Sequence, residues 1–104
     1  MIVINPQVIK KIQKMQEDLK KAQAEIHAST FYGQAGGSVV KVAVKGTKEV
    51  LSIQIKKEEV DINDLEMIQD LIVAALNDAF RKVDKELEET LGALSQGMKI
   101  PGMF

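Results

Sequence analysis

Residues 38–56 of this chain are SVVKVAVKGTKEVLSIQIK, and this pattern predicts a β-hairpin. Apolar side chains recur at every second position on both sides of a central turn, namely Val40, Val42, Val44, Leu51, Ile53 and Ile55. The turn is KGTK at 45–48, where the glycine admits a tight reversal. Successive strand residues point to opposite faces, so the hairpin has an apolar face and a polar face. The polar face carries Lys41, Lys45, Gln54 and Lys56.

On the N-terminal side of this hairpin the sequence predicts a third strand and a long helix. Residues 30–34 have strand character, and Ala35-Gly36-Gly37 then breaks the strand. Residues 6–29 are expected to be helical, with Asn5 as N-cap and Pro6 at the first helical position. A heptad-like apolar seam runs along this helix through Val8, Ile12, Met15, Leu19, Ala22 and Ile26.

On the C-terminal side the sequence predicts a second long helix that begins near Asn63. Asn63 and Glu66 have the spacing of a capping box, and Asp61 and Asp64 favour a helix N-terminus. The helix is apolar on a wide front as far as Phe80, then carries a thin seam among charges, and Pro101 forbids its continuation. Core and dimer contacts are expected from Leu71, Ile72, Ala75, Leu76, Asn77, Ala79 and Phe80. Asn77 and Asp78 interrupt the apolar face, and they either set a dimer register from a buried position or point to solvent.

The chain is therefore expected to be a single α+β domain over residues 1–104, with the element order α-β-β-β-α. A strand of about seven residues spans roughly 23 Å, whereas a helix of about 24 residues spans roughly 36 Å. Both helices must then overhang the sheet and project from it as an arm. A small body with an exposed apolar helix face is expected to dimerise about a two-fold axis, which leaves a cleft between two arms.

Composition narrows the functional class. The chain has no cysteine and one histidine, His27, so a thiolate site and a cysteine nucleophile are excluded. The acids of residues 58–70 lack the ligand ladder of a calcium loop and are better explained by helix capping. Gly33, Gly36 and Gly37 are followed by a strand, which favours turn geometry over a phosphate loop. Neither an enzyme nor a cofactor, metal or small-molecule substrate is expected, and no segment is long and apolar enough for a signal peptide or membrane helix.

Charge is distributed unevenly along the chain. Residues 1–57 carry ten lysines and four acidic residues, a formal charge of +6, and the remainder carries −7. Such asymmetry is typical of polyanion binding but is equally compatible with two halves that attract each other. The candidate phosphate-binding residues are Lys10, Lys11, Lys14, Lys21, Arg81, Lys82 and Lys85. A lysine stripe is also common on a solvated helix face, so a protein-interaction module and RNA binding stay open as alternatives.

Three motifs resemble those of the YbaB/EbfC family. They are FYGQAGG at 31–37 followed by VKV at 40–42, DLIVAALNDA at 70–79 followed by Lys82, and the tail GMKIPGMF at 97–104. Met15-Gln16 within a lysine-rich helix fits the same family, and the resemblance covers essentially the whole chain.

The resemblance implies a tweezers-like homodimer that binds duplex DNA through its projecting helices and alters DNA conformation. It further implies a bacterial, cytoplasmic, nucleoid-associated protein with roles in nucleoid organisation, gene regulation and DNA protection.

Overall fold

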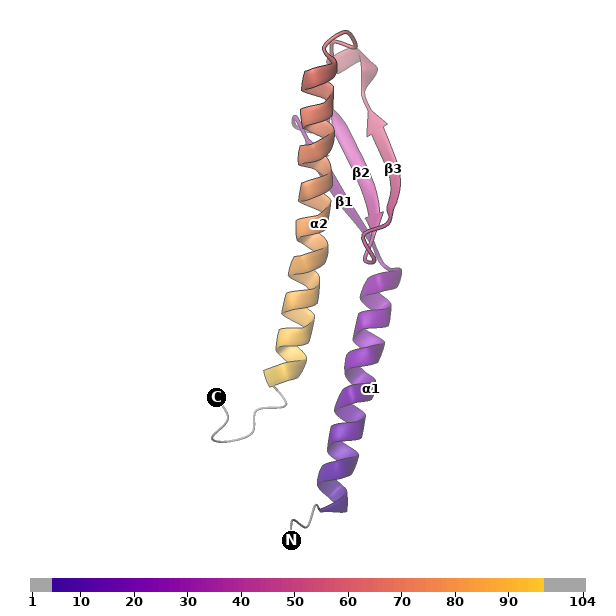
Figure 1. Ribbon diagram of the computed structural model, residues 1–104, viewed down its shortest axis with the longest axis vertical. Helices are drawn as coiled ribbons and strands as arrows, with labels where there is room; N and C mark the ends of the chain where they lie inside the picture. The colour runs from indigo at the N-terminus through magenta and orange to yellow at the C-terminus, as the bar shows by residue number, and fades with distance from the viewer. Residues whose placement is uncertain (1–4, 97–104) are drawn as a thin grey trace.

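The computed structural model describes residues 5–96, with side chains as far as Leu94. The elements are α1 (Pro6–Ala28), β1 (Thr30–Ala35), β2 (Val40–Lys45), β3 (Val50–Ile55), the single 3₁₀ turn η1 (Lys57–Glu59) and α2 (Leu65–Gln96) (Figure 1). The predicted α-β-β-β-α order is confirmed, and the short 3₁₀ turn is the element that the sequence did not indicate. The third family motif, at 97–104, lies outside the described residues. Over residues 5–96 neither helix is apolar enough along its length to cross a bilayer.

The three strands form an antiparallel sheet in the order β1-β2-β3. The β1–β2 turn contains Gly36 and Gly37, both with positive φ, as the turn interpretation of these glycines requires. The β2–β3 turn closes through a hydrogen bond from the Lys48 N–H to the Lys45 carbonyl, and Lys48 itself has a φ of 69°. The predicted hairpin at 38–56 is thus confirmed, and each of its strands is two residues shorter than expected.

The core lies between α2 and the first two strands. Val40, Val42 and Val44 of β2 are almost completely buried, and they face Ala75, Ala79 and Val83 of α2. The residues around this core are half-buried and apolar: Phe31, Ala35, Val39, Leu71, Ile72, Leu76, Phe80 and Leu87. The small alanines allow α2 to lie close to the sheet.

Gly33 makes the closest approach of α2 to the sheet possible. It is buried in the middle of β1, and a Cβ placed on it would collide with the backbone of Ala75 and Ala79. The interpretation of Gly33 as a turn residue was therefore wrong, because this glycine is required for packing and not for chain reversal. Gly46 has the same function at the lower end of the sheet, where a Cβ would meet the backbone of Ile26 in α1.

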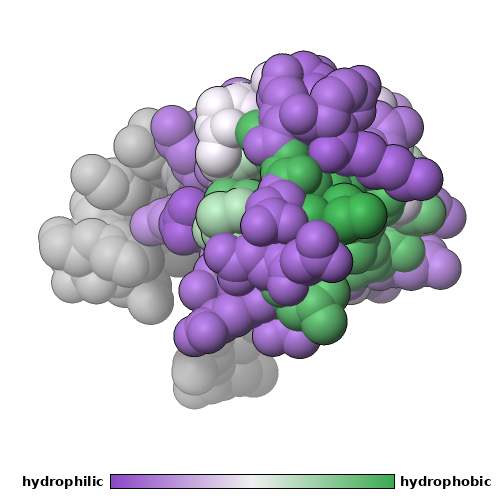
Figure 2. All heavy atoms as spheres, turned by 90° about the horizontal axis from the view of Figure 1, so that it is seen from above, coloured by the Kyte–Doolittle hydropathy of each residue, from purple (hydrophilic) through white to green (hydrophobic). Residues whose placement is uncertain are grey.

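The strand β3 is not covered by α2. Ile53 and Ile55 pair with Val42 and Val40, so their side chains lie on the face of the sheet that α2 occupies. Because α2 packs on β1 and β2, Ile53 and Ile55 remain 43% and 36% exposed. In the isolated chain, α2 therefore covers the apolar face of the sheet over only two of its three strands. Figure 2 looks down on this end of the molecule and shows hydrophobic surface gathered on one side between hydrophilic regions.

The helix α1 continues away from the sheet and gives the molecule its length of 73 Å (Figure 1). Its N-cap is Asn5 as predicted, since the Asn5 side chain accepts a hydrogen bond from the Gln7 N–H. Only Ile26 of the predicted seam is buried, and Val8 and Ile12 are 47% and 44% exposed. Both helices overhang the sheet as expected, and α2 lies beside the C-terminal half of α1, where side chains of both helices line one hollow (Figure 1).

The start of α2 differs from the prediction. The helix begins at Leu65, and Asp64 is its cap, since the Asp64 carboxylate accepts a hydrogen bond from the Met67 N–H. The capping box of Asn63 and Glu66 was wrong, because the Asn63 N–H is held by the side chain of Asp61. The acids of this segment therefore organise the turn before α2, and no group of three or more candidate metal ligands occurs within residues 5–96.

Candidate nucleic-acid interface

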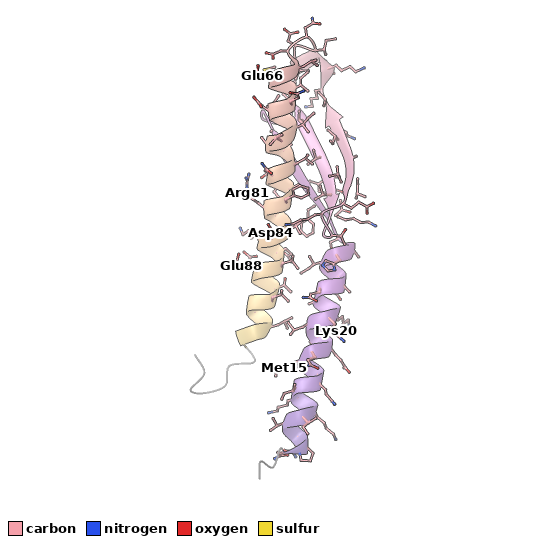
Figure 3. All side chains as sticks on the ribbon, viewed as in Figure 1. Met15, Lys20, Glu66, Arg81, Asp84 and Glu88 are labelled. Atoms are coloured by element: carbon pink, nitrogen blue, oxygen red, sulfur yellow. The ribbon has the colours of Figure 1, made fainter. Side chains whose placement is uncertain are left out.

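The lysines of α1 lie on an exposed helix that has few contacts with the rest of the chain. Lys10, Lys11, Lys14 and Lys21 are all exposed, and so is Lys20, which sequence reasoning left out of the candidate set (Figure 3). Within residues 5–96 none of these five lysines forms an ion pair. A helix of 23 residues spans about 35 Å, so the unpaired charges are spread along a projecting rod.

The cations of α2 are in a different environment. Arg81 and Lys82 both contact Asp78, at 3.8 Å and 3.5 Å, and Lys85 lies 4.0 Å from Glu89. The seven candidate residues are thus not gathered into one patch in the single chain. The four on α1 form no ion pair, although Lys21 shares a hollow with Glu86 and Glu89 of α2, and the three on α2 are each paired with a carboxylate of the same helix.

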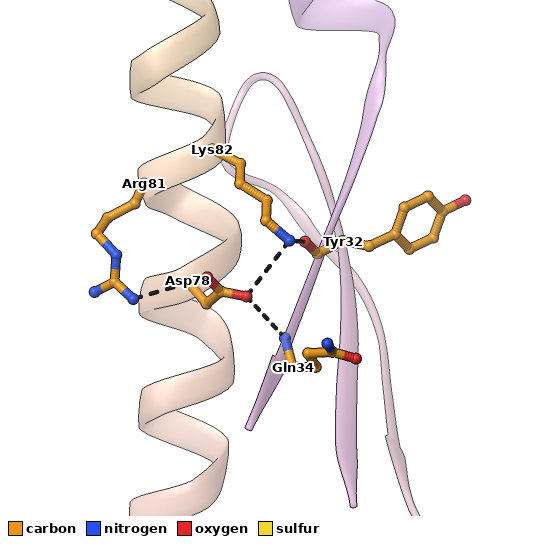
Figure 4. Close-up of polar contacts among 5 residues, drawn as sticks. All are labelled: Tyr32, Gln34, Asp78, Arg81 and Lys82. Atoms are coloured by element: carbon orange, nitrogen blue, oxygen red, sulfur yellow. Dashed lines mark hydrogen bonds and ion pairs between the residues drawn. The ribbon is translucent and has the colours of Figure 1, made fainter. Parts of the chain in front are cut away.

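Asp78 and Lys82 bind the outer edge of β1 (Figure 4). The Gln34 N–H donates to the Asp78 carboxylate at 3.1 Å, and the Lys82 ammonium donates to the Tyr32 carbonyl at 2.7 Å. These two backbone groups belong to an edge strand and would otherwise be open to another chain. Arg81 extends to the opposite side, away from the sheet.

Within the single chain Asp78 is neither buried nor directed freely to solvent, because it contacts the edge of β1 with a side chain that is 29% exposed. Asn77 is exposed in this chain. The only signal for the Asp78 contact was its i, i+4 spacing to Lys82, which predicts an intrahelical pair and gives no hint of β1.

The pKa of the Asp78 carboxyl is lowered below its ordinary value. The main cause is the hydrogen bond from the Gln34 backbone N–H, which favours the ionised form. The positive charges of Lys82 and Arg81 act in the same direction, and together these effects outweigh partial burial, which acts the other way.

Replacing Asp78 by asparagine is expected to lower the free energy of unfolding by about 1 kcal/mol at pH 7. The amide keeps an acceptor for the Gln34 N–H but loses the charge that the two cations stabilise. A lowered folded-state pKa stabilises the fold above the unfolded value, near 3.8, and this contribution disappears as the pH falls through the folded-state pKa. Urea denaturation should therefore show a wild-type advantage at pH 7 that shrinks below pH 3.8. An equal advantage at both pH values would contradict this explanation.

The residues expected in the core or a dimer contact divide into three groups. Ala75 and Ala79 are buried against β2, and Leu71, Ile72, Leu76 and Phe80 are half-buried around them. Asn77, as noted, lies on the exposed side. The half-buried members are partly open to solvent in the single chain.

Comparison with known proteins gives a consistent result. The family model described as "YbaB/EbfC DNA-binding family" matches residues 5–98. A protein of Alkaliphilus metalliredigens named "Nucleoid-associated protein" is 45% identical over 97 residues, which cover 93% of this chain and 85% of the relative. A nucleoid-associated protein of Oceanobacillus iheyensis is 44% identical, with 93% of both chains covered. The crystal structure of an uncharacterized protein from Helicobacter pylori matches with a TM-score of 0.65 and 23% identity over 93% of this chain and 98% of that one, which supports the fold.

Proposed function

Because this chain belongs to the YbaB/EbfC DNA-binding family, we propose that it is a homodimer that binds duplex DNA between two arms formed by α1. The observation that carries the proposal is the row of exposed α1 lysines without acidic partners. Lysine ammonium groups contact phosphates as point charges and provide affinity without sequence information. Binding of this kind depends on DNA shape and accommodates bending of the duplex, as a protein that organises the nucleoid in the bacterial cytoplasm requires.

The cations of α2 have a secondary role in this proposal. Arg81 and Lys85 are 71% and 75% exposed, and ion pairs of such exposed groups contribute about 0–1 kcal/mol, so phosphates can compete with their carboxylate partners. Lys82 is the weakest candidate, since its ammonium already donates to the Tyr32 carbonyl. Phosphate contact is therefore assigned first to Lys10, Lys11, Lys14 and Lys21.

The uncovered apolar surface supports the dimer. Ile53 and Ile55 of β3 are exposed, and Ile62 and Leu65 before and at the start of α2 are 63% and 64% exposed. Large apolar side chains gathered on one side of a small protein mark a contact with another chain. A two-fold axis at this surface would give a dimer with two projecting α1 arms, in agreement with the expectation from the sequence.

DNA affinity is expected to fall steeply with salt. Each phosphate neutralised releases condensed counterions, so the slope of log affinity against log salt should be about −0.9 per phosphate. Anisotropy titrations of a labelled duplex at several salt concentrations give this slope. An affinity that does not change with salt, or no binding at low salt, would overturn the proposal.

The dimer is tested by a charge at its proposed centre. Ile53→Lys places an ammonium group on the exposed apolar face of β3, where burial against a second copy would require its desolvation at a cost of several kcal/mol. Sedimentation equilibrium should show a dimer for the wild type and a monomer for the variant. Thr47→Lys, in the exposed β2–β3 turn, is the matched control and should remain dimeric. A monomeric wild type, or a variant as dimeric as the control, would contradict this interface.

A further inference from the structure

The face of the sheet that points away from α2 has a hollow of about 450 Å³. The side chains at the base of the hollow are small, since Ala43 of β2 pairs with Ser52 of β3. On its other side Ala43 pairs with Tyr32 of β1. The described residues that line the hollow are Tyr32, Gly33, Gln34, Lys41, Val42, Ala43, Ser52, Gln54 and Lys82. This surface belongs neither to the α1 arm nor to the apolar face proposed for the dimer.

The chemistry of this hollow is specific. Tyr32, the one tyrosine of the chain, is 66% exposed. Gln34, Lys41 and Gln54 form one cross-strand row beside it, so two amides flank an ammonium group. Within residues 5–96 Lys41 forms no ion pair, and no carboxylate is among the residues that line the hollow. An exposed ring, a free cation and two amides together suit a planar base attached to a phosphate.

We propose that this face binds an unpaired nucleotide of a single-stranded nucleic acid. The base stacks on the Tyr32 ring, the amides of Gln34 and Gln54 reach its edge, and Lys41 contacts the adjoining phosphate. Bases within a duplex are stacked on one another and offer no free face to a side chain on a sheet, so the site selects unpaired strands. Thr30 and Lys45 continue the same face beyond Tyr32, so a strand crossing the sheet meets a second cation, which is exposed and lies 4.0 Å from the Glu49 carboxylate. A free nucleotide would have only the single free charge of Lys41.

Tyr32 also provides the measurement. The chain has one tyrosine and no tryptophan, so its intrinsic fluorescence reports on this hollow alone. Titration with oligothymidylate of about ten nucleotides, within the span that such sites cover, should quench the emission to a saturating level. A duplex of equal length should leave the emission nearly unchanged. Absence of quenching by the single strand, or equal quenching by the duplex, would overturn the proposal.

Variants then separate stacking from charge. Anisotropy of fluorescein-labelled oligothymidylate should show about tenfold weaker binding for Tyr32→Leu, which keeps the bulk of the side chain but removes the π-system. Tyr32→Phe is the matched control and should stay within about twofold of the wild type, because it keeps the ring. Lys41→Gln should weaken binding and reduce the salt slope by about 0.7. Wild-type affinity in Tyr32→Leu would contradict the site.

Two further measurements give distinct outcomes. Duplex affinity of Tyr32→Leu and Lys41→Gln should equal that of the wild type, so loss of the single-strand site is distinguishable from failure of the proposed function. Thymidine monophosphate should quench Tyr32 only at concentrations far above those of the oligonucleotide. Equal quenching by the mononucleotide would overturn strand binding in favour of a free nucleotide.

Discussion

Substitution of Gly33 by alanine is expected to cost about 3 kcal/mol or more of the free energy of unfolding, a large share of the ~5–15 kcal/mol typical of a domain. The added methyl group would occupy the space of the α2 backbone at Ala75 and Ala79, which a change of side-chain rotamer cannot relieve. The helix must then move away from β1, and the contacts of Val42 with α2 loosen. Urea denaturation followed by circular dichroism, at a single protein concentration, measures this loss.

Gly92 supplies the matched control for that experiment. A Cβ on Gly92 meets nothing within 4 Å, and the residue lies inside α2. Gly92→Ala should therefore raise the stability by about 0.5–1 kcal/mol, since alanine is the better helix former. If Gly33→Ala were as stable as the wild type, the close packing of α2 on β1 would be refuted.

The second large expected effect is a loss of duplex affinity when lysines of α1 are replaced. Reversing two charges in α1, with Lys10→Glu and Lys14→Glu, is expected to weaken duplex binding by at least about hundredfold and to lower the salt slope by about 3 to 4 per dimer. The physical reason is that four proposed phosphate contacts per dimer become repulsive. Anisotropy at low and moderate salt measures both quantities, and circular dichroism checks that the helix persists.

Lys56→Glu with Lys57→Glu is the matched charge control. It changes the net charge by the same amount but acts at the opposite end of the molecule, beyond β3 (Figure 1). This control should retain duplex affinity within a few-fold. If the two double variants lost equal affinity, total charge would explain the binding, and if neither lost any, the lysines would serve only as a solvated face. The latter result would favour the protein-interaction module, which a pull-down with the α1 variant then tests.

Local sequence patterns predicted the elements of this fold well. The alternation around Val42 and Ile53 fixed both strands of the hairpin, and Asn5 marked the start of α1, because each signal depends on neighbours within a few residues. The start of α2 failed for the same reason. Asp61, Asn63 and Asp64 are all favoured in turns and helix caps. The sequence alone therefore did not show that Asp61 accepts from the Asn63 N–H and Asp64 from the Met67 N–H.

The features that depend on distant parts of the chain were beyond sequence patterns. Gly33 resembles any turn glycine until α2 is placed above it. The hydrogen bond between Asp78 and Gln34 of β1 joins residues 44 positions apart, and the Lys48 ammonium lies 2.9 Å from the Asp84 carboxylate, 36 positions away. The ion pairs of Arg81, Lys82 and Lys85 are local pairs within α2, whereas the contacts of Asp78 and Lys82 with β1 depend on tertiary structure.

The capped outer edge of β1 limits how this protein can assemble. Asp78 and Lys82 occupy that edge. On β3 the Lys56 N–H bonds to the Val39 carbonyl, so the backbone groups of Lys56 point toward β2. Because these groups alternate in direction along an antiparallel strand, those of Ile53 and Ile55 point outward. A sheet with two open edges can add copies head to tail without end and grow into a fibre. With one edge blocked, strand addition can join only β3 to β3, and such an association closes on itself after two subunits.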